Sequence, residues 1–204
     1  MGEEILNSVT HGIGALLSLA GLVLLIVVSV KQGTVWHVVG SCVFGSSLIL
    51  LYTVSTFYHS ATNPALKRFF ARLDHVAIFL LIAGTYTPFV LTALRGPLGW
   101  TLFGVIWTLA LIGVIIRSIY LSRFRALMVV LYLLMGWLIV FAVGPMARAL
   151  PRLSLVCLVS GGLCYTLGVT FYAWRQLKYS HGIWHLFVLA GSGFHFFAVL
   201  TSIR

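Results

Sequence analysis

Apolar residues fill most of the chain in long runs, which short clusters of charged residues, proline and glycine separate. A helix that crosses a bilayer needs about 20 consecutive, largely apolar residues. Seven runs meet this requirement. They cover residues 8–30, 35–58, 73–94, 98–119, 126–144, 153–174 and 182–203. The pattern therefore predicts an all-α integral membrane protein, a bundle of seven transmembrane helices.

The connections between these runs are short, for example residues 31–34, 95–97 and 150–152. Short connections make neighbouring helices antiparallel and leave no room for a soluble domain. We therefore expect residues 1–204 to form a single membrane domain. No cleavable signal peptide is expected, because the N-terminus is acidic and the first apolar run is longer than the apolar part of a signal peptide.

The composition excludes a water-soluble protein. Hydrophobic residues make up 61% of the chain and charged residues 8%, whereas soluble domains carry about 25% charged residues. The net charge of +10 does not indicate nucleic-acid binding, because the basic residues are scattered between apolar runs rather than gathered on one solvated face. Cys42, Cys157 and Cys164 lie in apolar stretches without CxxC spacing, so neither a disulfide framework nor a thiolate zinc site is predicted.

The distribution of basic residues predicts the orientation. With seven spans, the N-terminus lies on the same side as the connections after the second, fourth and sixth spans. That side carries eight basic residues and the opposite side carries five. The first set is Lys67, Arg68, Arg72, Arg117, Arg123, Arg125, Arg175 and Lys178, and the second is Lys31, Arg95, Arg148, Arg152 and Arg204. Because Lys and Arg are enriched in cytoplasmic loops, we expect a cytoplasmic N-terminus and a C-terminus outside.

Acidic residues are rare, and Asp74 is the only aspartate in the chain. It opens the predicted third span. An ionisable group at such a place is costly and indicates a partner or a function, unless it only faces water at the membrane rim.

His181 and His185 are four residues apart at the start of the seventh span. Side chains at this spacing share one face of a helix and can converge on one metal ion. The alternative is a pair of hydrogen-bonded histidines at the membrane interface.

Alternating helix directions place the end of the second span and the starts of the first, third and seventh spans on the same membrane face. His59, at the end of the second span, can therefore approach His181 and His185, and Asp74 is available at a similar depth. Three histidine ligands with one open position are typical of a catalytic rather than a structural zinc site.

Other polar residues accompany these histidines. Ser55 lies one turn before His59 on the same helix face, as either a packing serine or a hydrogen-bond donor to the site. Glu4, Asn7 and His11 form one polar stripe on the first helix. This stripe serves either as helix capping and solvation at the rim or as part of the site.

Three motifs at these span ends resemble those of the hemolysin III family. They are Glu4-x2-Asn7-x2-Thr10-His11, then Ser55-x3-His59 followed by Leu73-Asp74, then His181-x3-His185. This family belongs to the progestin and adipoQ receptor superfamily, which is distantly similar to alkaline ceramidases. The resemblance covers nearly the whole chain. It implies a seven-helix bundle in the cell membrane, here a bacterial inner membrane, with a cytoplasmic N-terminus and a zinc ion near the cytoplasmic face.

By the same resemblance, His59, His181 and His185 would be the zinc ligands. Asp74 would hold a zinc-bound water, with Ser55 beside it. The leading hypothesis is then a Zn²⁺-dependent intramembrane hydrolase that cleaves an amide or ester bond of a membrane lipid, as a ceramidase does. Asp74 would orient or deprotonate the water, and Ser55 would donate a hydrogen bond to the developing oxyanion.

Two other functions stay open. One is a non-catalytic protein with a structural zinc ion, either a pore-forming, cytolytic protein or a protein that affects ion balance. The other is a ligand-sensing receptor. The lipid bilayer is the expected environment in each case, a membrane lipid is the expected substrate of the hydrolase, no nucleic-acid partner is expected, and oligomerisation stays open.

Overall fold

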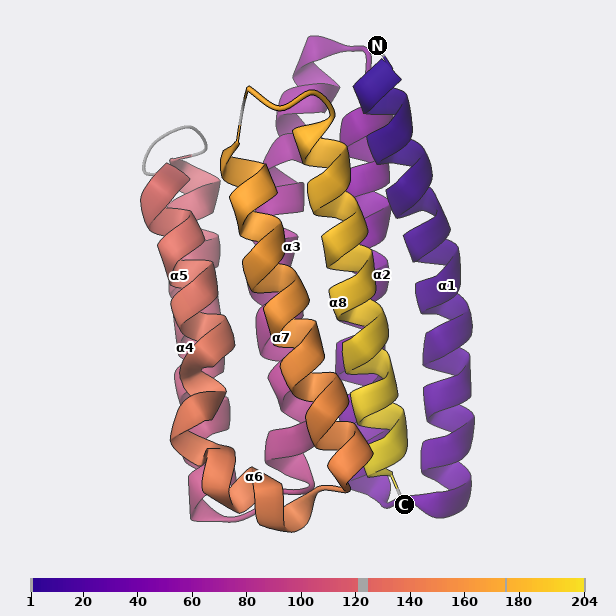
Figure 1. Ribbon diagram of the computed structural model, residues 1–204, viewed down its shortest axis with the longest axis vertical. Coiled ribbons are helices and arrows are strands. Elements are labelled where there is room, and N and C mark those ends of the chain that lie inside the picture. Colours follow the sequence, from indigo (N-terminus) through magenta and orange to yellow (C-terminus); the bar gives the residue numbers. More distant parts are fainter. Residues whose placement is uncertain (1, 121–124, 175, 204) are drawn as a thin grey trace.

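The computed structural model describes residues 2–120, 125–174 and 176–203. Its elements are helices that run side by side along one long axis (Figure 1). In chain order they are α1 (Gly2–Gln32), α2 (Val35–Ser60), α3 (Pro64–Leu91), α4 (Pro97–Ile119), α5 (Arg125–Trp137), the 3-10 helix η1 (Leu138–Ala142), α6 (Val143–Ala149), α7 (Arg152–Ala173) and α8 (Ser180–Ser202). Seven segments are long and apolar enough to span a membrane, which confirms the predicted number.

Successive helices are antiparallel, and the two chain ends lie at opposite ends of the bundle (Figure 1). We call these the N-terminal end and the C-terminal end. α1 packs against α2 and α8, so the first and last helices are neighbours. The starts of α1 and α8 and the end of α2 therefore meet at the N-terminal end, as the alternating directions predict.

The surface of the bundle is apolar. Large apolar side chains lie on the outside of the helices: Leu16 is 71% exposed and Phe141 is 82% exposed. Side chains such as Phe44 and Phe79 fill the interior. Large apolar side chains on the outside of a helical bundle are expected where lipid replaces water as the solvent. The chain is an integral membrane protein.

The fifth span is interrupted, which differs from the continuous helix predicted for residues 126–144. α5 ends at Trp137 and the chain passes through η1 before α6. The break leaves backbone groups without partners inside the helix, and the hydroxyl group of Tyr86 meets them. It lies 2.8 Å from the carbonyl oxygen of Met135 and 2.9 Å from that of Gly136, and it accepts the N–H of Ile139 at 2.9 Å. A tyrosine from α3 therefore stabilises an irregular backbone that lipid could not solvate.

α3 begins nine residues before the predicted start of the third span. Pro64 is its first residue, and the side chain of Asn63 accepts the backbone N–H of Ala65 at 2.8 Å, as an N-cap does. The predicted boundary follows the apolar run and excludes the basic first turns. Asp74 consequently lies well inside α3, about 15 Å along the axis from its first residue at 1.5 Å per residue, and does not open the helix.

Candidate metal centre

Three imidazole rings meet at the N-terminal end of the bundle. His59 comes from the last turn of α2, and His181 and His185 come from the first turns of α8. One ring nitrogen from each residue lies within 4.8 Å of the other two. The ring centroids are 5.1 Å apart for His59 and His181, 5.0 Å for His59 and His185, and 4.7 Å for His181 and His185. The structure thus brings together the three histidines that the sequence selects.

The polar stripe of α1 contacts the outer sides of two of these rings. Nδ1 of His59 lies 2.8 Å from Oε2 of Glu4, and the amide nitrogen of the Asn7 side chain lies 3.5 Å from the same Nδ1. Nδ1 of His185 donates to the backbone carbonyl of Asn7 at 3.3 Å. With its Nδ1 engaged by an acceptor, each ring carries its hydrogen there and keeps the lone pair on Nε2. Metal-binding histidines usually have such a partner on their second nitrogen.

Glu4 also forms an ion pair with a residue of α3. Its Oε1 lies 3.0 Å from Nζ of Lys67 in the first turn of α3. Glu3, next to it, accepts the backbone N–H of His181 at 3.2 Å. The first turn of α1 therefore makes polar contacts with α2, α3 and α8 around the histidine cluster. These contacts fix the position of α1 relative to the three rings.

His11 continues the stripe one turn further into the bundle. Its ring stacks on His185 with centroids 3.5 Å apart and planes at 9°, and its edge faces Tyr52 at 4.9 Å. Both ring nitrogens are buried and have no partner among the described residues. His11 thus contacts the cluster through one flat face, outside the group of three nitrogens.

Asp74 and Ser55 lie beside each other, one helical turn from His59. The neighbours of the Asp74 carboxylate are the hydroxyl of Ser55, which faces it as a hydrogen-bond donor, and the guanidinium group of Arg117. Ser55 is buried in α2 one turn before His59. An acid, a hydroxyl and a cation from three helices therefore gather one helical turn from His59.

The structure corrects the environment expected for Arg117. The predicted fourth span includes it, but the charge count assigns it to the connection that follows; it lies in the last turn of α4 and is 2% exposed. Its Nε and one terminal nitrogen have no hydrogen-bond partner in the described residues. A buried arginine in a membrane protein is costly enough to indicate a function. The signal available in the sequence is its position just inside an apolar run, before Ser118 and Ile119.

The donor set fits a metal ion. Nε2 of His59 is buried and has no partner in the described chain, which is the condition expected of a nitrogen that awaits a ligand. Imidazole nitrogens suit zinc, copper, iron and nickel, whereas calcium and magnesium prefer oxygen donors. The buried His59, His181 and His185 cluster could therefore bind a metal ion of the first kind.

Seven membrane-spanning helices with a buried histidine cluster at one end define an integral membrane protein with a candidate metal centre. The chain matches the Haemolysin-III related family over residues 1–196 and belongs to that family. It is 49% identical to Hemolysin-3 of Bacillus cereus over 201 residues, which cover 98% of this chain and 92% of that protein. It is also 46% identical to the Hemolysin-3 homolog of Bacillus subtilis over 198 residues, with 97% and 93% covered.

The similarity extends to a mammalian protein. The chain is 29% identical over 170 residues to the Monocyte to macrophage differentiation factor of Homo sapiens, with 80% of this chain and 70% of that protein covered. No solved structure matches the chain. The family agrees with the resemblance inferred from the three motifs.

Proposed function

We propose that this protein is a zinc-dependent intramembrane hydrolase that cleaves an amide or ester bond of a membrane lipid. The observation that carries the proposal is the cluster of His59, His181 and His185 inside a membrane bundle. Ser55, a neighbour of the Asp74 carboxylate, lies one helical turn from His59. Three protein donors leave a fourth position of a tetrahedral ion open, as in catalytic zinc sites. The chemistry that zinc supplies in such a site is the activation of water at neutral pH and the polarisation of a carbonyl group.

The surrounding residues have distinct roles in this proposal. Glu4 and the backbone of Asn7 hold the outer nitrogens of His59 and His185, so that both rings keep their Nε2 directed into the site. Asp74 accepts the proton of the attacking water. A carboxylate is a competent base when it lies within hydrogen-bond reach of the water.

Ser55 and Arg117 are suited to stabilise negative charge. The Ser55 hydroxyl faces the Asp74 carboxylate, and it can turn to donate to the oxyanion that develops at the scissile carbonyl. The Arg117 guanidinium keeps a positive charge close to Asp74 in a site shielded from water. Preorganised groups of this kind often contribute more to catalysis than any other single effect, because they stabilise charge where it develops.

We further propose that the N-terminal end faces the cytoplasm of a bacterial cell. Removing the buried Arg117 from the loop count still leaves seven basic residues on that side against five on the other. The Bacillus origin of two relatives supports a location in a bacterial cell membrane.

A non-catalytic role is the second candidate, and the name Hemolysin-3 of the Bacillus cereus relative favours it. In that case the metal ion would fix α1, α2 and α8 together in a protein that forms pores or alters ion balance. The two functions make different demands on Asp74. A structural ion needs the three histidines, whereas hydrolysis also needs the acid.

The proposal is tested with purified, zinc-loaded protein in nanodiscs that contain ceramides or diacyl phospholipids. Release of fatty acid, measured by mass spectrometry, is expected from the unmodified protein and from Arg152→Gln, a control at an exposed residue of the opposite end of the bundle. Release should be lost in His59→Ala. If zinc binds in a one-to-one ratio and no lipid in the panel is cleaved, the hydrolase is wrong and the structural role stands.

A further inference from the structure

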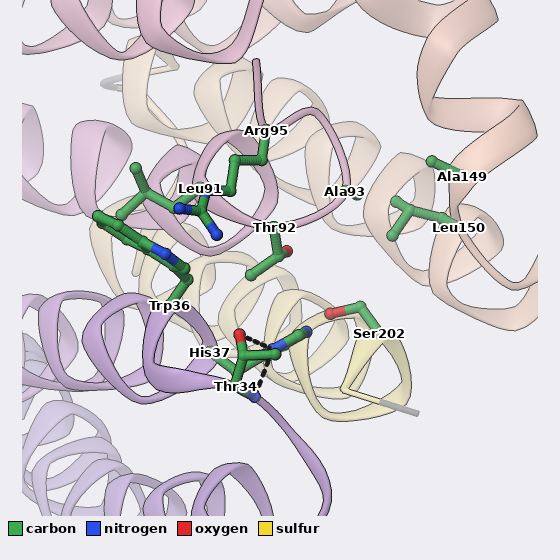
Figure 2. A pocket seen from close by; sticks show the side chains of 10 residues that line it. All are labelled: Thr34, Trp36, His37, Leu91, Thr92, Ala93, Arg95, Ala149, Leu150 and Ser202. Carbon is green, nitrogen blue, oxygen red and sulfur yellow. Dashed lines mark hydrogen bonds between the residues drawn. The ribbon is translucent and has the colours of Figure 1, made fainter.

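A cavity of about 280 Å³ opens at the C-terminal end of the bundle, opposite the histidine cluster (Figure 2). It lies where the α1–α2, α3–α4 and α6–α7 connections meet the end of α8. Its lining residues are Thr34, Trp36, His37, Leu91, Thr92, Ala93, Arg95, Ala149, Leu150 and Ser202. The volume is slightly below that of pockets for drug-sized molecules. It is therefore suited to a small polar group rather than to a whole lipid.

Arg95 supplies a cation without a carboxylate partner. Its guanidinium carbon lies 4.4 Å from the ring centroid of Trp36, so the group is stacked on the indole at the cavity (Figure 2). The three acidic residues of the chain, Glu3, Glu4 and Asp74, belong to the N-terminal end. No acidic side chain of the described residues therefore lies near Arg95, and its guanidinium group is suited to pair with an anionic ligand.

The hydroxyl groups of the cavity offer acceptors rather than donors. Thr92 Oγ1 donates its hydrogen to the carbonyl of Pro88 at 2.6 Å, and Ser202 Oγ donates to the carbonyl of Val199 at 2.7 Å. What these two hydroxyls present to a ligand is oxygen lone pairs. A matching ligand therefore carries its own hydroxyl or amine hydrogens.

His37 holds the rim of the cavity together. Its Nδ1 accepts the backbone N–H of Thr34 at 3.0 Å, and Thr34 Oγ1 lies 3.0 Å from the same nitrogen (Figure 2). In a neutral imidazole whose Nδ1 is an acceptor, the hydrogen is on Nε2, and the backbone carbonyl of Ser202 is its acceptor. What the cavity offers a ligand is therefore the guanidinium group and hydroxyl oxygens that accept.

The depth of the cavity matches lipid headgroups. Trp36 and Trp100 form an edge-to-face pair at 5.8 Å beside it, and tryptophan is enriched at the membrane–water interface. Basic pockets between transmembrane helices on the cytoplasmic side bind the headgroups of anionic lipids, and this cavity offers the same chemistry at the opposite membrane face.

We propose that this cavity binds the phosphoglycerol headgroup of an anionic phospholipid. The phosphate pairs with Arg95, and the glycerol hydroxyls donate to Thr92 and Ser202. A phosphoethanolamine headgroup fits less well, because its ammonium group would lie near Arg95 with no carboxylate to balance it. A phosphocholine headgroup has no N–H or O–H to donate. This site does not depend on the proposed hydrolysis.

Native mass spectrometry of delipidated protein in detergent tests the proposal, with phosphatidylglycerol, phosphatidylethanolamine and phosphatidylcholine added in turn. Affinity should fall in that order. Arg95→Gln should weaken phosphatidylglycerol binding by about tenfold or more, and Arg95→Lys by less. Arg152→Gln is the matched control, because this exposed arginine lies at the same end but does not line the cavity. Equal binding of the three lipids, or equal losses in Arg95→Gln and Arg152→Gln, would overturn the site.

Two further arms test the hydroxyl contacts and the source of the phosphate. Phosphatidylmethanol has the same charge as phosphatidylglycerol but lacks the headgroup hydroxyls, so it should bind more weakly to the unmodified protein. Ser202→Ala should reduce the difference in affinity between the two lipids. An unchanged difference would show that Ser202 does not contact the headgroup. Soluble glycerol phosphate should not displace the lipid at millimolar concentration. Displacement would mean that the cavity is a site for soluble phosphate esters and that the lipid assignment is wrong.

Discussion

Nδ1 of His59 lies 2.8 Å from Oε2 of Glu4, although 55 residues separate the two in the sequence. The contact joins the first turn of α1 to the last turn of α2. It also sets the hydrogen-bonding role of the ring, because a carboxylate at Nδ1 stabilises the tautomer with its hydrogen there and leaves the lone pair on Nε2. A glutamate that looks from the sequence like a helix-terminus charge thus contacts the histidine cluster.

Replacing Glu4 should weaken metal binding without removing a ligand. In Glu4→Ala, His59 loses the acceptor that orients it, and loss of such partners typically lowers metal affinity 10- to 100-fold. Competition between the protein and a fluorescent zinc chelator measures the change. Lys67→Gln is the control, since Lys67 contacts Glu4 but not the rings, and it should alter the affinity by only a few fold. Equal losses in the two variants would show that the ion pair, rather than the contact with His59, supports the site.

The orientation can be tested by cysteine labelling from the two sides of the membrane. We expect Lys67→Cys, at the N-terminal end, to be protected from a membrane-impermeant maleimide in intact cells and labelled in inverted vesicles. Arg95→Cys, at the C-terminal end, should behave in the opposite way. The native Cys42, Cys157 and Cys164 are replaced by serine or alanine first, because they are free thiols. Labelling of Lys67→Cys in intact cells, with protection of Arg95→Cys, would reverse the proposed topology.

The sequence is sufficient to predict the seven spans and the meeting of the three histidines. Long apolar runs predict the spans, and the alternating directions of successive helices determine which helix ends lie together. Side-chain rotation is harder to predict. The spacing of Glu4, Asn7 and His11 predicts one face of α1, yet it does not say that Glu4 contacts His59 while His11 stacks on His185. Those contacts depend on how α1 is rotated against α2 and α8, which many small packing interactions determine together.

Two features lie beyond the hydropathy pattern. Arg117 lies near the end of the predicted fourth span, where a positive charge usually marks the membrane surface, so it is expected with the basic residues of the following connection. In the structure it is buried and a neighbour of Asp74. The break after Trp137 occurs within a continuous apolar run, so hydropathy gives no sign of it. It depends on Tyr86, a residue from another helix.

Close packing of α2 on α3 predicts a strong effect of one methyl group. A Cβ at Gly40 would lie 2.6 Å from the backbone Cα of Pro88, which cannot move aside as a side chain could. Gly40→Ala should therefore destabilise the bundle by about 1–3 kcal/mol, as overpacking does, and lower the melting temperature in detergent. Gly104→Ala is the control, because a Cβ there meets nothing within 4 Å and alanine favours helix. An unchanged melting temperature for Gly40→Ala would mean that the two helices are not packed this closely.

The last prediction separates the role of Asp74 from that of the histidines. Asp74→Asn keeps the size and a hydrogen-bonding group of the side chain but removes the base. Zinc content should be largely retained, while lipid hydrolysis should fall about 10²-fold or more. His59→Ala removes a ligand instead. Because binding to the folded state adds to its stability, metal content and the melting temperature should fall together in that variant.

Two measurements on each variant decide between these roles: zinc content by elemental analysis, and the melting temperature with and without a chelator. For the unmodified protein and for Asp74→Asn, the chelator should lower the melting temperature by similar amounts. For His59→Ala it should have little further effect, since the ion is already weakly bound. If Asp74→Asn loses zinc as completely as His59→Ala, the carboxylate is itself a ligand. The fourth position would then be filled by the protein, and a hydrolytic mechanism that needs this position open would have to be abandoned.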